Sequence, residues 1–398
     1  MMKHENSISM KTVFIAAGAF ISYTIGAGFA SGNEVLQFFG SWGFPESFLA
    51  IIGAAIVTLT YCVCLYRTGQ NISFKKTSDA YRFFGGKVLG PFFQIFVFVF
   101  ILGCFMLMFS GAGSLLNQFL GIPQWIGAVA LGIVTGVIVL GGLKTVENVL
   151  GSAGLVILAY VVLFGIVALF HPAASIGQSV GATEAVAEGK IWQANLFELP
   201  PLGWIPNLAY FNSPIITGIL YGALCVVSGF PFYLTLGRQM KSAKEATISG
   251  IVTTVSFYAC VGCSLLIMLT NFNSLTDPAT GEMQPFPVLA GVNAMWPAGS
   301  WTYAIIIFAG IFTTAAGYLW VLADWFFPGQ EKTKKTQGFI LIMLIAGVFL
   351  GGVIPFSQLI NFMFPLTGVA GVIMTITILV KTIKGYEKTT DAEVTVEV

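Results

Sequence analysis

The sequence predicts an all-α polytopic membrane protein with ten transmembrane helices, arranged as two inverted halves of five. Hydrophobic residues make up 56% of its 398 residues and charged residues only 9%, whereas charged residues are roughly 25% of a soluble domain. Apolar windows of about 20 residues, each long enough to cross a bilayer, follow one another along the chain. The first and the sixth of these windows are interrupted by glycine or proline.

One transmembrane domain, residues 1–398, is expected to contain two repeats. The first repeat covers residues 12–170 and the second covers 214–384; an extracellular loop over 171–213 joins them, and a disordered cytoplasmic tail covers 385–398. The predicted spans are 12–39, 44–66, 88–119, 124–141, 149–170, 214–237, 249–270, 301–326, 337–354 and 356–381.

Basic residues orient these spans. All but Lys190 of the 18 lysines and arginines fall on the side that carries both termini. By the positive-inside rule, both termini of this multi-pass protein are cytoplasmic. We expect the membrane to be the cell membrane. The two long outer loops, 171–213 and 271–300, contain prolines and aromatic residues and few charges. We expect both loops to pack as caps over the bundle.

The first span is expected to break in its middle. Residues 26–34 read Gly-Ala-Gly-Phe-Ala-Ser-Gly-Asn-Glu inside an apolar run. Three glycines lower the helix propensity at the depth where a lost backbone hydrogen bond is most costly. Such a break persists only where protein or a water-filled cavity satisfies the freed N–H and C=O groups. An ion or a small polar solute can bind those same groups.

The sixth span carries a second interruption, Ser228-Gly229-Phe230-Pro231, in which the proline lacks an N–H. Similar short motifs in the third and eighth spans begin at Phe109 and Phe312, and they are separated by nearly the same number of residues as the two breaks. Interrupted helices at matching positions of inverted halves indicate a substrate site near the membrane midplane. The alternative is that these glycines only allow close helix packing.

This arrangement resembles the LeuT fold of the amino acid–polyamine–organocation superfamily. The run from Gly26 to Glu34 resembles the YkvI-like membrane proteins of that superfamily. The resemblance implies a secondary transporter that moves a small solute by alternating access. A membrane enzyme is disfavoured, because the spans contain no histidine and no metal-ligand spacing such as His-Glu-x-x-His.

The solute is expected to bind backbone groups, because no lysine or arginine lies within a predicted membrane core. Free amides between Ala27 and Ser31 would hold a carboxylate, and carbonyls near Ile25 and Val227 would hold an ammonium group. Phe230 and Phe109 either wall this pocket or pack as ordinary core residues. The candidate substrate-binding residues are Gly26, Ala27, Gly28, Phe29, Ala30, Ser31, Phe109, Val227, Ser228, Gly229 and Phe230.

Sodium is the predicted coupling ion, and no other cofactor is expected. Thr313 and Thr314 offer adjacent hydroxyls in the eighth span, although a threonine in a helix often bonds to its own backbone. Sodium-coupled members of the resembled family place a hydroxyl pair here, and motif matching adds the carbonyls of Ser22 and Ile25. Some proton-coupled relatives instead place a lysine from the fifth span in this space, and residues 149–170 contain none.

Three ionisable residues are candidates for gating or coupling. Glu34 lies about 9 Å outward of Gly28 at ~1.5 Å per helical residue, at a depth where an ionisable group is a functional hypothesis by default. It gates the vestibule, attracts a cationic solute, titrates as a coupling proton site, or lies at the wet interface. Lys11 and Asp324 match the inner-gate pair of the resembled family.

The sequence therefore predicts a sodium-coupled symporter of an amino acid or a similar small zwitterion. Its expected partners are the solute and the lipid bilayer, with no nucleic acid, and its oligomeric state is open. A proton-coupled transporter that uses Glu34 is one alternative. A non-transporting sensor or germinant-type receptor on the same fold is the other.

Overall fold

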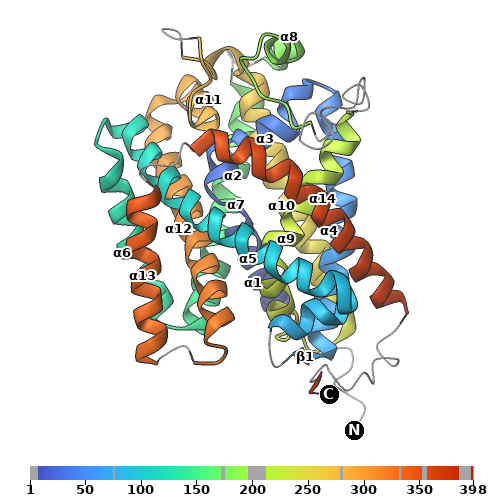
Figure 1. Ribbon diagram of the computed structural model, residues 1–398. Coiled ribbons are helices and arrows are strands. Elements are labelled where there is room, and N and C mark those ends of the chain that lie inside the picture. The colour runs from blue at the N-terminus through green and yellow to red at the C-terminus, as the bar shows by residue number, and fades with distance from the viewer. Residues whose placement is uncertain are drawn as a thin grey trace.

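A computed structural model describes residues 8–74, 77–171, 175–195, 212–277, 281–330, 333–351, 356–384 and 396–397. These residues are almost entirely helical, as the sequence predicts. Long helices lie side by side, and both termini lie at the same end of the bundle (Figure 1). We call this end the termini end, and the opposite end, where α8 and α11 lie, the capped end.

The helices that correspond to the predicted spans follow one another in the predicted order. They are α1 (Met10–Thr24), α2 (Ala27–Ser31), α3 (Asn33–Phe38), α4 (Glu46–Asn71), α5 (Thr77–Leu120), α6 (Gln124–Leu140), α7 (Leu143–Phe170), α9 (Pro214–Gly237), α10 (Ala243–Thr270), α12 (Pro297–Phe326), α13 (Lys334–Gly351) and α14 (Phe356–Ile383). Shorter elements are the 3-10 turns η1 (Gly40–Trp42), η2 (Ile176–Gly181) and η5 (Phe272–Ser274), the helices α8 (Ala182–Ala187) and α11 (Pro287–Met295), and the strands β1 (Ser73–Phe74) and β2 (Val396–Glu397).

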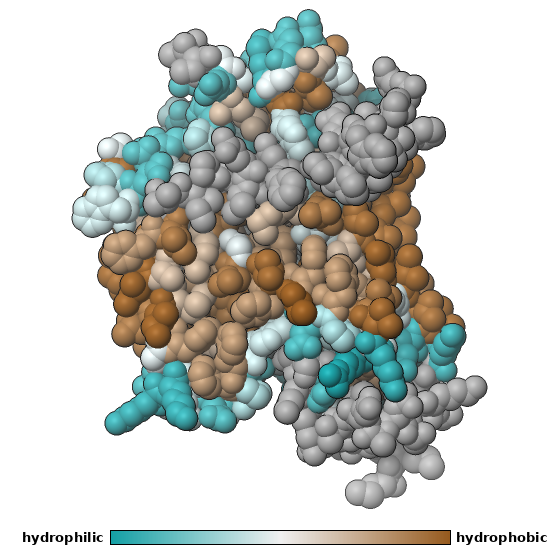
Figure 2. All heavy atoms as spheres, in the orientation of Figure 1, coloured by the Kyte–Doolittle hydropathy of each residue, from teal (hydrophilic) through white to brown (hydrophobic). Residues whose placement is uncertain are grey.

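Helix lengths and surface composition are those of a membrane protein. Among the described residues, 8 helices are long and apolar enough to cross a membrane, and α1 and α6 are shorter apolar helices. Figure 2 shows hydrophobic residues in a band around the middle of the visible face, with hydrophilic residues at both ends. The number of helices that cross the membrane stays a prediction.

Helical structure begins before two of the predicted spans. The element α5 begins at Thr77, but Gly86, with φ 64° and ψ −156°, is not helical and separates a short helix before it from the long helix that matches the predicted span 88–119. Helix α7 starts at Leu143, so its first turn includes Lys144, which is exposed. Polar residues at a membrane interface continue a helix without adding to its apolar window, which is why hydropathy alone misses these turns.

The prediction that the sixth span is interrupted is wrong, because α9 is a continuous helix that contains Pro231. Side-chain hydroxyls occupy the nearby carbonyls. The Cys225 carbonyl accepts hydrogen bonds from Ser228 Oγ at 3.0 Å and Tyr233 Oη at 3.2 Å, and the Ser228 carbonyl accepts one from Tyr23 Oη at 2.9 Å. The carbonyl that Pro231 itself leaves without a helical partner is that of Val227, four residues earlier.

The loop over residues 271–300 packs as the predicted cap. It contains α11, which the sequence did not predict as a helix, and Val288, Leu289 and Val292 on that helix are almost completely buried. The outer loop 171–213 contributes η2 and α8 to the same end, while its residues 172–174 and 196–211 lie outside the described residues.

The C-terminal tail is not disordered throughout, which corrects the prediction for 385–398. Val396 and Glu397 form β2, which pairs antiparallel with β1 (Ser73–Phe74). The alternating Val-Thr-Val-Glu-Val end of the chain has high strand propensity, which explains this pairing. Residues 385–395 and 398 lie outside the described residues.

Glycines bring α1 unusually close to α7. A Cβ placed on Gly154 would overlap the Gly18 carbonyl oxygen and would lie 2.6 Å from the Gly18 carbonyl carbon. A Cβ on Gly18 would in turn overlap the Gly151 carbonyl oxygen. These contacts hold the end of α1, and therefore the break that follows it, at a fixed position against α7.

Candidate functional site

The predicted break in the first span is confirmed. Helix α1 ends at Thr24, Ile25 leaves helical geometry with φ −77° and ψ 71°, and Gly26 is extended with φ −83° and ψ −168°. A second interruption separates α2 from α3 at Gly32, whose φ of 91° lies in the left-handed region that favours glycine. The first span is therefore three helical pieces.

The break releases the Ser22 carbonyl oxygen from its usual helical partner, because the Gly26 amide bonds to the Thr24 carbonyl at 2.8 Å. Both threonine hydroxyls of α12 lie within hydrogen-bond distance of the released oxygen. Thr314 Oγ1 donates to Ser22 O at 2.9 Å. Thr313 Oγ1 lies 3.0 Å from Ser22 O, and it also lies 2.9 and 3.0 Å from the carbonyls of Ala309 and Gly310 in its own helix, so its one hydrogen serves one of three acceptors at a time. Three of the four residues predicted to bind the ion, Ser22, Thr313 and Thr314, thus meet at the end of α1.

Two further carbonyls lie at the same corner. A Cβ on Gly310 would lie 2.9 Å from the Ile25 carbonyl oxygen, so α12 approaches the break closely at this glycine. The Gly310 carbonyl accepts a hydrogen bond from Thr313 Oγ1 at 3.0 Å. Gly310 is not among the predicted site residues. It lies about one helical turn before Thr313, so both residues lie on the same side of α12. We call the carbonyls of Ser22, Ile25 and Gly310 and the hydroxyls of Thr313 and Thr314 the oxygen corner.

Helix α7 covers the oxygen corner with small residues. Ser22 Oγ donates to the Leu150 carbonyl at 2.6 Å, and a Cβ on Gly154 would lie 2.8 Å from Ser22 Oγ. No lysine amine enters this space within the described part of α7, because Lys144 is exposed in its first turn. The chemistry of the corner is that of neutral oxygens, which bind hard cations in broken transporter helices.

Phe109 does not line the break, which corrects that prediction. Its ring lies against Gly347 of α13 and 3.6 Å from a Cβ on Gly132 of α6. Met108 faces the break instead: its Sδ accepts a hydrogen bond from the Ala27 amide at 3.2 Å. Neighbouring residues on a helix point about 100° apart, so a one-residue error in helix rotation selects the wrong side chain.

The predicted wall residue Phe230 and the candidate substrate-binding residue Phe29 have different neighbours. Phe29 packs against Phe257 of α10 with ring centroids 5.7 Å apart. Phe230 packs against Tyr81 and Phe84 near the start of α5, with centroids 4.7 and 5.6 Å apart. The structure records no ring contact between Phe29 and Phe230 among the described residues.

Glu34 turns back into the break. A Cβ on Gly28 would overlap Glu34 Oε1 and would lie 2.8 Å from Glu34 Cδ. Tyr221 Oη of α9 donates to Glu34 Oε2 at 3.3 Å, and the Phe29 backbone amide also bonds to the carboxylate. The residue is only 8% exposed. The interpretation of Glu34 as a carboxylate at the wet interface is therefore wrong.

Several amides predicted to hold a solute carboxylate already have partners. The Ala27 amide bonds to Met108, the Phe29 amide bonds to Glu34, and the Ala30 amide bonds to the Gly26 carbonyl at 2.8 Å. Ser31 does not turn its hydroxyl to a solute either, since Ser31 Oγ donates to the Gly28 carbonyl at 2.8 Å.

The predicted inner-gate residues are not joined. Lys11 is exposed, and the described residues contain no ion pair between it and Asp324, which accepts a hydrogen bond from the Gly329 amide at 3.4 Å. The start of α1 is held by Glu245 instead. This buried carboxylate accepts from the Ser9 amide at 3.1 Å and from the Lys241 amide at 2.7 Å. Ser242 and Glu245 have the three-residue spacing of a capping box, and this spacing in the sequence indicates a helix start at Ser242.

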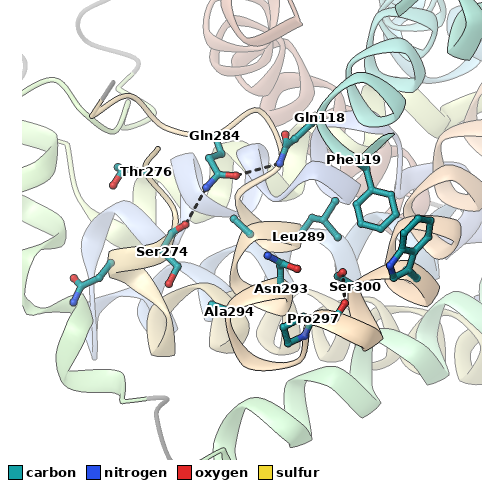
Figure 3. A pocket seen from close by; sticks show the side chains of 13 residues that line it. Gln118, Phe119, Ser274, Thr276, Gln284, Leu289, Asn293, Ala294, Pro297 and Ser300 are labelled. Carbon is teal, nitrogen blue, oxygen red and sulfur yellow. Dashed lines mark hydrogen bonds between the residues drawn. The ribbon is translucent and has the colours of Figure 1, made fainter. Parts of the chain in front are cut away.

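A separate pocket of about 670 Å³ opens at the capped end between α5, α11 and α12. Figure 3 shows Gln118 and Gln284 pointing toward one another, with Phe119 beside them. Gln118 Nε2 donates to Gln284 Oε1 at 3.3 Å, and Gln284 Nε2 donates to the Ser274 carbonyl at 3.3 Å. None of the residues that line this pocket is a predicted site residue.

No family model matches the chain. Two proteins of Bacillus subtilis (strain 168) are similar to it over most of their lengths. The chain is 22% identical over 364 residues to the uncharacterized membrane protein YkvI, covering 88% of this chain and 91% of YkvI. It is 24% identical over 376 residues to the uncharacterized protein YyaD, covering 93% and 96%. The chain is a membrane protein homologous to YkvI.

Solved transporter structures share its architecture. MhsT in complex with L-phenylalanine matches with a TM-score of 0.60 at 13% identity, covering 96% of this chain and 98% of MhsT. The chain has the LeuT fold. MHP1, a nucleobase-cation-symport-1 family transporter with bromovinylhydantoin bound, matches with a TM-score of 0.56 at 14% identity and coverages of 94% and 78%. A Na⁺-coupled sialic acid symporter matches with 0.52 at 13% identity and coverages of 94% and 89%. At these identities the likeness establishes the fold alone.

Proposed function

We propose that this protein is a secondary active transporter that couples the movement of a small organic solute to sodium by alternating access. The observation that carries the proposal is the oxygen corner, where two hydroxyls of α12 meet carbonyls released by the break after Thr24. Unwound backbone carbonyls of this kind coordinate Na⁺ in transporters built from inverted repeats.

The composition of the oxygen corner favours sodium over a proton. The atoms that would coordinate the ion are neutral oxygens. In the described residues no carboxylate bonds to Thr313 or Thr314. Both hydroxyls lie within hydrogen-bond distance of Ser22 O. Rotation about the C–O bond lets each hydroxyl turn its oxygen lone pairs toward a cation and its hydrogen away.

The similar solved structures fit this proposal. One of them is a Na⁺-coupled symporter of sialic acid, one is a transporter of the nucleobase-cation-symport-1 family, and MhsT binds L-phenylalanine. The three ligands differ widely in shape and charge. The fold therefore supports coupled transport of a small solute, whereas the class of solute must come from this chain's own residues.

Thermal unfolding in Na⁺ and in K⁺ tests the ion. Purified protein is expected to unfold at a higher temperature in NaCl than in KCl, because a ligand that binds only the folded state stabilises it. Thr314→Ala removes one of the five oxygens and is expected to abolish this difference. Thr60→Ala, a half-buried threonine of α4 that bonds to its own helix, is the matched control and should keep the difference.

Uptake into proteoliposomes tests the coupling, using a solute that stabilises the protein in the same assay. A sodium gradient is expected to drive uptake, and Thr314→Ala to abolish it. Uptake that follows a pH gradient and ignores both sodium and Thr314→Ala would contradict sodium coupling and support the proton-coupled alternative. Solute binding without gradient-driven uptake would support a sensor or receptor.

A further inference from the structure

The carboxylate of Glu34 occupies the place in the break where a solute carboxylate was expected. It lies against Gly28 and accepts a hydrogen bond from the Phe29 amide. A solute carboxylate bound to the same stretch of α2 would lie beside this negative charge, and two like charges at short range in a partly dry site repel strongly. The first residues of α2 are therefore a poor site for an anionic group.

No cation of the protein balances this charge in the described structure. The ion pair recorded there joins Lys190 to Glu188, both of them well exposed, in the outer loop. Every lysine and arginine lies outside the predicted membrane cores. A carboxylate that is 8% exposed and faces no cationic side chain is costly, because burial of a charge requires a partner of opposite charge or neutralisation.

The carboxylate keeps acceptor capacity for a ligand. An ionised carboxylate accepts at about four lone-pair sites. The Tyr221 hydroxyl and the Phe29 amide are its recorded partners, and they orient it. Lone pairs therefore remain for the N–H groups of an incoming ammonium.

Aromatic rings pack beside the two residues that hold this carboxylate. Phe29 lies against Phe257, and the Phe257 ring stacks parallel to Tyr221, the hydrogen-bond partner of Glu34, with centroids 6.4 Å apart and planes 2° apart. The faces of aromatic rings attract ammonium groups, and a carboxylate with flanking rings is a suitable site for an organic cation.

We propose that Glu34 is the residue that binds the charged amine of the transported solute, and that the solute is an organic amine without a carboxylate. The proposal deepens the proposed transport function and rests on it. It replaces the zwitterion expected from the sequence with a cation, and it gives Tyr221 the role of orienting the Glu34 carboxylate.

Three probes of nearly the same shape separate these solute classes: 2-phenylethylamine, L-phenylalanine and 3-phenylpropionate. Thermal unfolding of the full chain is measured with each probe up to 10 mM, in NaCl and in KCl. 2-Phenylethylamine is expected to raise the unfolding temperature, L-phenylalanine to raise it much less, and 3-phenylpropionate to leave it unchanged. The amine response of Glu34→Gln should require at least tenfold more probe, while Glu46→Gln, an exposed carboxylate at the start of α4, should respond as the wild type does.

Sodium-dependent stabilisation of Glu34→Gln reports whether that variant is folded. If it is not, Tyr221→Phe provides the second test, with a severalfold weaker amine response expected. Equal stabilisation by L-phenylalanine and the amine would overturn the proposal. So would an amine response that survives Glu34→Gln, or no amine response in a wild type that responds to sodium. A wild type that responds to the amine but not to sodium would instead contradict sodium coupling and leave the amine site standing.

Discussion

The first and the sixth spans carry similar interruptions in sequence but differ in structure. The first separates into α1, α2 and α3, whereas the sixth is the continuous helix α9 with Pro231 inside it. At the first, the released Ser22 carbonyl is met by hydroxyls of a different helix, α12. At the second, the Cys225 carbonyl is met largely by hydroxyls of α9 itself.

This difference shows that glycine and proline permit a break but do not decide it. In α9 the Cys225 carbonyl is bonded by two hydroxyls of its own helix and the Ser228 carbonyl by Tyr23 of α1, and the helix remains continuous. In the first span the Ser22 carbonyl has lost its helical partner, so it is available for exchange with a ligand. The working site therefore lies beside α1, α2 and α12, and α9 contributes the side chain of Tyr221 rather than open backbone.

The largest expected effect follows from separating α1 from α7. Gly154→Val places a branched side chain against the Gly18 carbonyl. Overpacking of this kind costs about 1–3 kcal/mol, so the unfolding temperature should fall by several degrees. Gly262→Val on α10 is the matched control, since no atom lies within 4 Å of a Cβ there. Equal effects of the two substitutions would show that the close packing of α1 on α7 does not hold the broken helix.

A more local effect is expected at the oxygen corner. Gly310→Ala places a methyl group 2.9 Å from the Ile25 carbonyl oxygen and displaces it by a few tenths of an ångström. Half-maximal stabilisation should then require about tenfold more sodium, equivalent to about 1.4 kcal/mol. Gly338→Ala on α13, where a Cβ meets nothing within 4 Å, should leave the sodium titration unchanged. An unchanged titration in Gly310→Ala would remove Ile25 from the ion site.

The smallest effect is expected in α9. Pro231→Ala restores a backbone N–H to a helix that is already continuous. The expected result is a stabilisation of about 1 kcal/mol, the typical net value of one hydrogen bond, with unchanged responses to sodium and to solute. Loss of either response would contradict the contrast between the two spans, because it would show that the proline interruption of α9 is itself functional.

Much of the fold was predictable from hydrophobicity and glycine placement. The positions of the long helices and the break after Thr24 depend on local composition, and the sequence carries that directly. The lateral partners depend on helix rotation, which no single sequence contains. Local composition therefore indicates Phe109 where Met108 faces the break, and it does not predict the return of the Glu34 side chain to Gly28.

The central claim is that the break in the first span leaves an oxygen site for sodium. Saturable binding of radioactive ²²Na⁺ to the purified protein measures this directly, with Thr313→Val and Thr314→Val combined as the variant. We predict saturable binding in the wild type that is lost in the double variant. Equal sodium binding by the two proteins would contradict the account.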